Sequence, residues 1–124
     1  MALRAVTRSG AALHDFNEGH VAAIAAAGDC GKSRPAVIVQ TDAFPETHAP
    51  MTVCQMTSEL SAALDFRIAV DPSDANGLRV RSQVMADGPV TVRGGCIRRR
   101  IGRLGVEDVR RLNVALAFVM GLAD

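Results

Sequence analysis

The chain has 124 residues, a length that indicates one domain whose core can fold without disulfides or metals. Hydrophobic residues make up 48% of the sequence, and this fraction excludes an intrinsically disordered chain. The 14 basic and 13 acidic residues leave a formal net charge of +1, so only a local basic face would attract a polyanion.

The N-terminal segment differs from the rest of the chain. Residues 1–16 are expected to form a loose extension, and residues 17–124 a single folded domain. The apolar stretch from Gly10 to Leu13 is too short for a signal peptide or a membrane span. Cys30, Cys54 and Cys96 show no CxxC spacing, which argues against a disulfide framework or a zinc site. Free thiols fit a reducing compartment, so the sequence predicts a cytoplasmic protein with no membrane anchor.

Short apolar segments separated by turn formers predict a mainly β domain. The expected strands span residues 20–27, 36–40, 51–56, 66–70, 82–86 and 89–93. The alanines of the first segment would also suit a helix. Turns are expected at residues 28–31, 71–77 and 87–88, and a polar loop with one short helical turn at residues 41–50.

The C-terminal segment has helical periodicity. Apolar residues recur at helical spacing from Val109 to Met120, and Glu107 and Asp108 stand in the first turn, where the helix dipole favours acids. The sequence therefore predicts a small antiparallel barrel closed by one helix, α+β in content and mainly β.

The sequence contains no signature of a common catalytic site: no Walker loop, no GxSxG and no HExxH. The three histidines are scattered, so neither a metal nor a cofactor is expected. Tryptophan and tyrosine are absent, and there are four phenylalanines. An RNA-binding surface of this chain would therefore depend on arginine planes and hydrogen bonds instead of stacking on aromatic rings.

Arg34 follows a glycine-containing turn and precedes a rigid strand, which puts it at a barrel rim. Thr57 and Ser58 follow the third expected strand, also at a rim. If the two rims coincide, a guanidinium and a hydroxyl form a phosphate site. The alternative is a structural arginine and a turn hydroxyl. The arginines of the C-terminal half, including residues 98–100, either form a basic face or are solvated on strand edges.

Several segments in order resemble the MazF/PemK toxin family. They are GKSRPAVIVQTDAF at residues 31–44, VCQMTS at 53–58, NGL at 76–78, SQVM at 82–85, TVR at 91–93 and IGRL at 101–104. Each segment alone is weak, but their order from residue 18 to residue 123 is fairly specific.

This resemblance implies an SH3-like barrel that forms homodimers and is neutralised by a small antitoxin. It implies the toxin of a type II toxin–antitoxin system, a sequence-specific endoribonuclease that cleaves single-stranded RNA (mRNA) without metal. The products would carry 2′,3′-cyclic phosphates, and translation and growth would stop. The family's catalytic pair corresponds to Arg34 and Thr57, and Ser58 is a neighbour that would share the role of Thr57.

The sequence departs from the family pattern near the expected site. The family opens with Arg-Gly-Asp or Arg-Gly-Glu, whereas this chain has Glu18-Gly19-His20. His20 either helps proton transfer or is a rim histidine without catalytic duty. Ser82 replaces an acid that some relatives carry, so a proton-shuttling carboxylate is missing there, and reduced activity is an expectation.

Three further residues are candidates for RNA contacts. Arg79 and Arg81 either bind RNA phosphates or belong to a solvated loop. Gln83 either reads a base or satisfies backbone groups. The alternative function is a non-nucleolytic toxin of the same fold, such as a CcdB-like gyrase inhibitor, or a degenerate antitoxin-binding module. The gyrase version is weak, because the chain has no tryptophan and ends in Gly-Leu-Ala-Asp.

Overall fold

The computed structural model describes residues 19–25, 33–39, 50–62, 66–92 and 96–122. Within these residues six strands form one sheet, in the order β4-β5-β3-β2-β1-β6, and one helix follows. The elements are β1 (His20–Ala25), β2 (Ser33–Ile38), β3 (Met51–Thr57), β4 (Arg67–Val70), β5 (Ser82–Val92), β6 (Ile97–Arg103) and α1 (Val106–Val119). Every strand pair is antiparallel.

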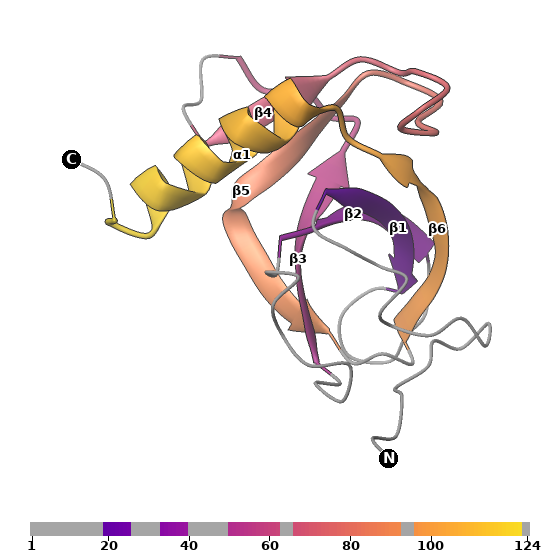
Figure 1. Ribbon diagram of the computed structural model, residues 1–124, viewed down its shortest axis with the longest axis horizontal. Helices are drawn as coiled ribbons and strands as arrows, with labels where there is room; N and C mark the ends of the chain where they lie inside the picture. The colour runs from indigo at the N-terminus through magenta and orange to yellow at the C-terminus, as the bar shows by residue number, and fades with distance from the viewer. Residues whose placement is uncertain (1–18, 26–32, 40–49, 63–65, 93–95, 123–124) are drawn as a thin grey trace.

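The sheet curls strongly around its own axis, as Figure 1 shows. Register shifts between Val21 and Ala22 and between Ala23 and Ile24 interrupt the pairing of β1 with β6. Such bulges bend a strand and increase its twist, which is how a small sheet rolls into a barrel. The mainly β barrel with a C-terminal helix matches the fold that the sequence predicts.

The predicted strands differ from the structure in three places. β2 begins at Ser33, three residues before the predicted start at residue 36, because Pro35 is tolerated inside this strand. The segments 82–86 and 89–93 were expected to be separate strands, but β5 runs without a break from Ser82 to Val92. Asp87 and Gly88 lie where the pairing of β5 with β3 changes register, so the turn signal marks a bulge inside one strand. β6 was not predicted as a strand, because its run of arginines hides the apolar alternation.

The core has two parts, one on each face of the sheet. On the helix side, buried residues of β1 to β5 pack with Leu112 and Ala115 of α1. On the other side, a second cluster includes Ile24, Ile38 and Ile97. Successive strand residues therefore enter opposite clusters, as the two-residue period of a strand requires.

The helix packs over β4 and β5 and has acids in its first turn, as predicted. Arg110 pairs with Glu107, and Arg111 pairs with Asp108 at 2.9 Å. Arg111 also donates to the backbone carbonyl of Ala69, which ties the helix to β4. In the described part of the chain, no helix is long and apolar enough to cross a membrane.

The cysteines do not all follow the expectation of free thiols. Cys54 is a free thiol in the core, and burial raises its pKa to about 12, so it stays protonated and unreactive at neutral pH. Cys96 is disulfide-bonded, and for this residue the expectation is wrong. The expected N-terminal extension, the turn at residues 28–31 and the helical turn at residues 41–50 lie outside the described residues.

Candidate active site

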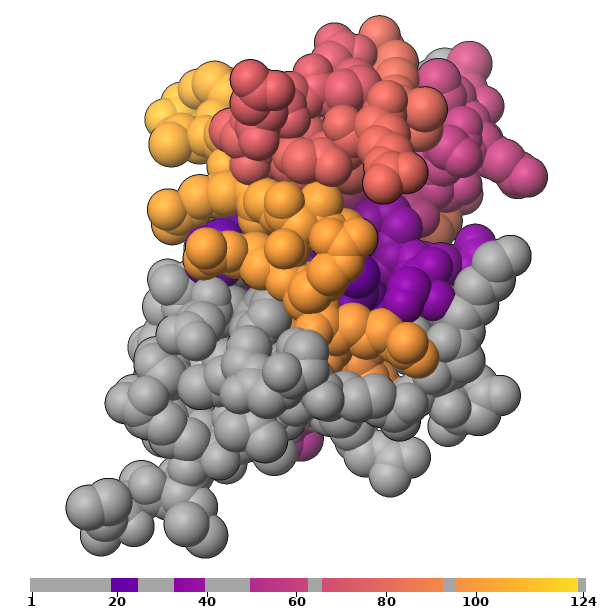
Figure 2. All heavy atoms as spheres, turned by 90° about the vertical axis from the view of Figure 1, so that its right-hand side faces the viewer, coloured from indigo at the N-terminus to yellow at the C-terminus, as the bar shows by residue number. Residues whose placement is uncertain are grey.

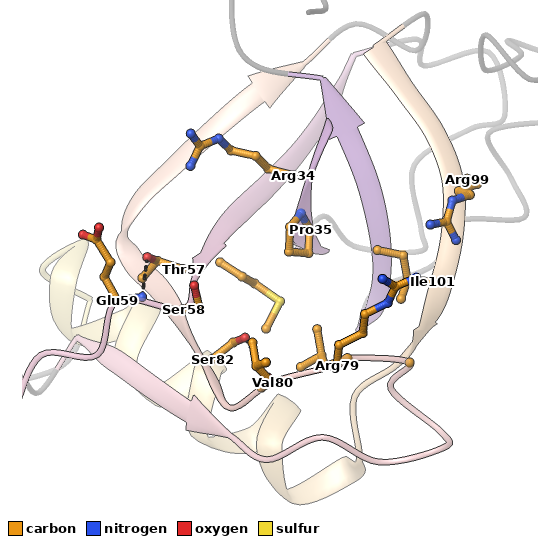
Figure 3. A pocket seen from close by; sticks show the side chains of 13 residues that line it. Arg34, Pro35, Thr57, Ser58, Glu59, Arg79, Val80, Ser82, Arg99 and Ile101 are labelled. Carbon is orange, nitrogen blue, oxygen red and sulfur yellow. Dashed lines mark hydrogen bonds between the residues drawn. The ribbon is translucent and has the colours of Figure 1, made fainter. Parts of the chain in front are cut away.

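A cavity of about 580 Å³ opens on the barrel between β2, β3, β6 and the loop that joins β4 to β5. Three arginines, two serines and one threonine contribute to its walls, together with one carboxylate and several apolar residues (Figure 3). The lining residues are Arg34, Pro35, Met56, Thr57, Ser58, Glu59, Gly77, Leu78, Arg79, Val80, Ser82, Arg99 and Ile101. The cavity thus combines an excess of positive charge with hydroxyl groups.

Arg34 and Thr57 meet in this cavity because β2 and β3 are neighbours in the sheet. These strands pair Ala36 with Gln55 and Val37 with Cys54. Continuing this register by two residues sets Arg34 opposite Thr57. The antiparallel ladder therefore brings a guanidinium and a hydroxyl from distant parts of the sequence to one rim.

The Thr57 hydroxyl is oriented by its own loop. The backbone N–H of Glu59 donates to Oγ1 of Thr57 at 3.0 Å, which uses one lone pair of this oxygen. The hydroxyl hydrogen is not used by this bond and remains able to donate. Thr57 can thus give a hydrogen bond to an anionic oxygen in the cavity, and Ser58 lines the cavity beside it.

Gln83 does not line the cavity but holds the segment after β3 in place. Its Nε2 donates to the carbonyl of Ser61 at 2.8 Å, and the N–H of Ser61 donates back to its Oε1 at 3.0 Å. Gln83 is buried and pairs with Thr57 across β3 and β5. Of the two interpretations offered for Gln83, the structure favours backbone satisfaction over base reading.

Ser82 is buried at the start of β5 and lines the cavity. Its hydroxyl donates to the carbonyl of Val80 at 3.0 Å, which fixes the last turn of the preceding loop. It carries no charge, so it cannot act as a proton-shuttling carboxylate. Glu59 is the one carboxylate among the cavity-lining residues that the structure describes.

The 71–81 loop (residues 71–81, between β4 and β5) brings Arg79 to the cavity. Asn76 is the buried centre of this loop. Its Oδ1 accepts from the N–H groups of Ser73 and Leu78 at 3.0 Å, and its Nδ2 donates to the carbonyl of Asp71 at 2.8 Å. These bonds define the loop without any regular secondary structure.

The same loop is pressed against β6. The N–H of Arg103 donates to the carbonyl of Ala75 at 2.8 Å. A Cβ on Gly77 would lie 2.3 Å from the carbonyl oxygen of Ile101, and Gly77 also has φ of +70°. A Cβ on Gly102 would lie 2.4 Å from the backbone of Asn76. Only glycine permits this close approach of the two backbones.

Arg99 of β6 lines the cavity, although the sequence reasoning did not name it as a site residue. Within the sheet, Ala23 of β1 pairs with Pro35 on one side and with Arg99 on the other. The Arg98–Arg100 run was noted as a possible basic face, but choosing among its members requires the β1–β6 register. That register contains two bulges, which no local pattern reveals.

Besides Gln83, two further predicted site residues lie outside the cavity lining. His20 is buried at the start of β1, opposite Arg103, and is not among the residues that line the cavity. Arg81 is exposed and pairs with Asp71 at 3.3 Å, and it does not line the cavity either. The structure therefore gathers Arg34, Thr57, Ser58 and Arg79, and it leaves His20, Arg81 and Gln83 outside.

Metal ligands do not cluster in the described part of the chain: it contains no group of three His, Cys, Asp or Glu residues suited to hold an ion. Within the same residues, no hydrogen bond joins Arg34 to Thr57. The two groups instead border a shared space.

The geometry and the comparisons with known proteins agree on the class of molecule. Residues 18–120 match the family of PemK-like, MazF-like toxins of type II toxin–antitoxin systems, and the chain belongs to this family. It is 38% identical over 93 residues to the probable endoribonuclease MazF of Mycolicibacterium smegmatis, which covers 75% of this chain and 84% of that protein. The resemblance identified in the sequence is thereby confirmed, and the MazF-type interpretation is supported over the gyrase-inhibitor alternative.

Solved structures confirm the fold. The Mycobacterium tuberculosis toxin MazF-mt6 matches with a TM-score of 0.73 at 23% identity, over 85% of this chain and 99% of that one. A mycobacterial endoribonuclease in complex with its cognate antitoxin matches with a TM-score of 0.73 at 22% identity, over 87% and 97%. A MazE–MazF structure from Deinococcus radiodurans matches with a TM-score of 0.70 at 18% identity, over 86% and 96%.

Proposed function

We propose that this chain is a metal-independent, sequence-specific endoribonuclease toxin that cuts single-stranded mRNA and leaves 2′,3′-cyclic phosphate ends. The observation that supports this most is that Arg34 and Thr57, from neighbouring strands, open on one cavity. A guanidinium beside a hydroxyl donor suits a phosphodiester, whose transition state gathers negative charge on its phosphorane oxygens.

In this proposal Arg34 and Thr57 bind the scissile phosphate. Arg34 offers planar N–H donors and a permanent charge, which stabilise the two non-bridging oxygens as the phosphorane forms. Thr57 donates its hydroxyl hydrogen to one of these oxygens, because its own oxygen is already held by the Glu59 N–H. Ser58 stands next to Thr57 and can add a second hydroxyl contact.

Proton transfer requires a second kind of group. The ribose 2′-OH loses its proton as the oxygen attacks phosphorus, the bond from phosphorus to the 5′ oxygen breaks, and that oxygen gains a proton. Arginine keeps its proton at neutral pH, so it serves poorly as the acceptor. We assign the acceptor role to Glu59, the carboxylate on the Thr57 side of the cavity (Figure 3).

The proposal extends to partners and location. The family model and the toxin–antitoxin complexes of related folds support a cognate antitoxin as the partner that neutralises this chain. The proposed toxin works as a homodimer in the cytoplasm, where its mRNA substrate is found.

The test is cleavage of a long single-stranded RNA in EDTA, with cut sites mapped by primer extension and end groups identified chemically. The wild-type protein is expected to cut at a short recurrent sequence. Arg34→Ala is expected to lower kcat roughly 100- to 1,000-fold. Thr57→Val should lower kcat, and Thr57→Ser should restore much of the activity because it keeps the hydroxyl.

Arg81→Ala is the matched control, because it removes one exposed arginine that does not line the cavity. It should cut at the wild-type rate. Intact RNA after incubation with wild-type protein, or equal rates for Arg34→Ala and Arg81→Ala, would refute the proposed function.

A further inference from the structure

We propose that Arg79 and Arg99 form a second phosphate subsite, which binds the RNA backbone phosphate next to the scissile one. This inference rests on the proposed ribonuclease function and extends it. The side of the cavity formed by Arg79 and Arg99, called the far side here, would bind the two non-bridging oxygens of a neighbouring phosphodiester. The side formed by Arg34 and Thr57, called the reactive side, would bind the scissile phosphate.

The two arginines come from different elements and reach the same side of the cavity. Arg79 follows Gly77 by two residues, and Arg99 precedes Ile101 by two residues. The backbones of Gly77 and Ile101 are in close contact, which brings these segments together. Figure 3 shows Arg79 and Arg99 on one side of the cavity and Thr57 and Glu59 on the other. Figure 2 shows the surface on which β2, β6 and the 71–81 loop adjoin.

Neither guanidinium has a counter-ion among the residues that the structure describes. Three other arginines of the described residues do pair with a carboxylate: Arg81 with Asp71, Arg110 with Glu107 and Arg111 with Asp108. Two like charges facing one space repel each other unless an anion lies between them. The carboxylate that lines this cavity, Glu59, lies on the opposite side (Figure 3). The charge pattern therefore favours an anionic ligand on the Arg79 side.

Apolar side chains also line the cavity. Met56, Leu78, Val80 and Ile101 contribute to its walls. They provide no hydrogen-bond donors for a phosphate, but they can contact the faces of a ribose or a base. The volume of about 580 Å³ lies in the range of small-molecule sites, roughly 300–1,000 Å³, and leaves room for one nucleotide. A nucleotide carries both apolar faces and phosphates, so it suits a cavity lined by apolar side chains and arginines.

Hydrogen bonds hold the backbone of the loop that carries Arg79. Asn76 makes its three side-chain hydrogen bonds within the 71–81 loop, and the backbone of the loop is bonded to Arg103. A subsite built on an ordered loop loses less conformational entropy on binding than one built on a free loop. This supports a binding role for Arg79 and argues against a merely solvated side chain.

The test compares RNA binding by wild type, Arg79→Ala, Arg99→Ala and the double variant. The ligand is a single-stranded RNA that contains a mapped cut site and a 2′-deoxy residue, which prevents cleavage. Loss of one phosphate contact should reduce the slope of log affinity against log salt by about 0.7. The double variant should therefore show a slope smaller by about 1.4. On the same RNA with a ribose at the cut site, its KM should rise about tenfold or more, and its kcat should stay within threefold of wild type.

A chemical probe locates the phosphate. A neutral methylphosphonate is placed, one position at a time, at the phosphates on either side of the cut. In wild type one neighbouring position should weaken binding, and in the double variant the same replacement should have no further effect. Arg81→Ala is the matched control and should respond to the methylphosphonate as wild type does.

The outcomes separate the two proposals. If wild type neither binds nor cuts single-stranded RNA, the ribonuclease proposal fails and this subsite fails with it. If wild type cuts RNA but the double variant keeps the salt slope of Arg81→Ala, the subsite alone is refuted. Equal weakening by the methylphosphonate in wild type and in the double variant also refutes it.

Discussion

Arginines in two regions of this molecule have opposite surroundings. On α1, Arg110 and Arg111 each pair with a carboxylate three residues earlier in the same helix. In the cavity, the three lining arginines come from three separate elements and have no carboxylate partner within the described residues. The two regions have similar residue types at the surface, but only one of them leaves its positive charge unbalanced.

The difference indicates what each set of arginines does. In an ion pair between residues i and i+3 of a helix, the charge of the arginine is balanced by the carboxylate. Such an exposed pair adds little to the free energy of folding, and its arginine has no unbalanced charge to attract an anionic ligand. The positive charge of several unpaired guanidinium groups around a cavity is balanced when an anionic ligand binds there. The net charge of +1 does not show which arginines are paired and which are unpaired. Only the positions of the carboxylates relative to each arginine show this.

The largest effect in this comparison is expected at Glu59, the carboxylate that shares the cavity with the arginines. Glu59→Gln keeps the shape of the side chain and removes the proposed proton acceptor, so kcat should fall about 100-fold. The cleavage rate of a single-stranded RNA at saturating substrate, compared between wild type and Glu59→Gln, measures this change.

Glu107→Gln is the matched control for this prediction, because Glu107 is an exposed carboxylate on α1. It should cut RNA at the wild-type rate. If Glu59→Gln keeps a rate within threefold of wild type, the proton acceptor is another group.

A smaller effect is expected at Asn76, which acts through Arg79 and does not line the cavity. Asn76→Ala removes the bonds that order the 71–81 loop and should raise KM about tenfold while kcat changes little. In a double-mutant cycle with Arg79→Ala the two effects should not add, because loop order matters for KM only while Arg79 is present.

Asn76→Asp provides a second variant in case the alanine variant unfolds. It keeps the oxygen that accepts from Ser73 and Leu78, so it should retain more loop order than alanine. Additive effects of Asn76→Ala and Arg79→Ala on KM, measured below the melting temperature of both, would contradict a positioning role.

The sequence predicts the reactive side of the cavity well because that side depends on local order. Arg34 begins one strand and Thr57 ends the next, so any antiparallel pairing of these strands brings the two residues near one rim. The turn formers and the apolar alternation locate both strands, although β2 begins three residues before its predicted start. The choice of Arg34 and Thr57 as a pair came from the family resemblance, and the β2–β3 register, continued by two residues, is consistent with it.

The far side of the cavity could not be predicted in the same way. The position of Arg99 depends on the pairing of β6 with β1, which contains two bulges. Gln83 contacts Ser61, which is 22 residues away in the sequence. Whether an arginine has a carboxylate partner likewise depends on which distant segments the fold brings together. Arg79 and Arg81 are two residues apart in one loop, yet Arg81 pairs with Asp71 and Arg79 lines the cavity. Sequence patterns treat these two residues alike.

The smallest effect is expected on α1, where the paired arginines should contribute slightly to stability and nothing to RNA binding. Arg110 lies 3.6 Å from Glu107, and both side chains are more than 70% exposed. Arg110→Ala should change the free energy of unfolding by less than about 0.5 kcal/mol, since solvent screens the pair and alanine favours the helix. Denaturant unfolding measures this change, and the salt slope of RNA binding should equal that of wild type. If Arg110→Ala reduced the salt slope of RNA binding as much as Arg79→Ala does, an arginine paired with a carboxylate would still bind RNA. The comparison between the two regions would then fail.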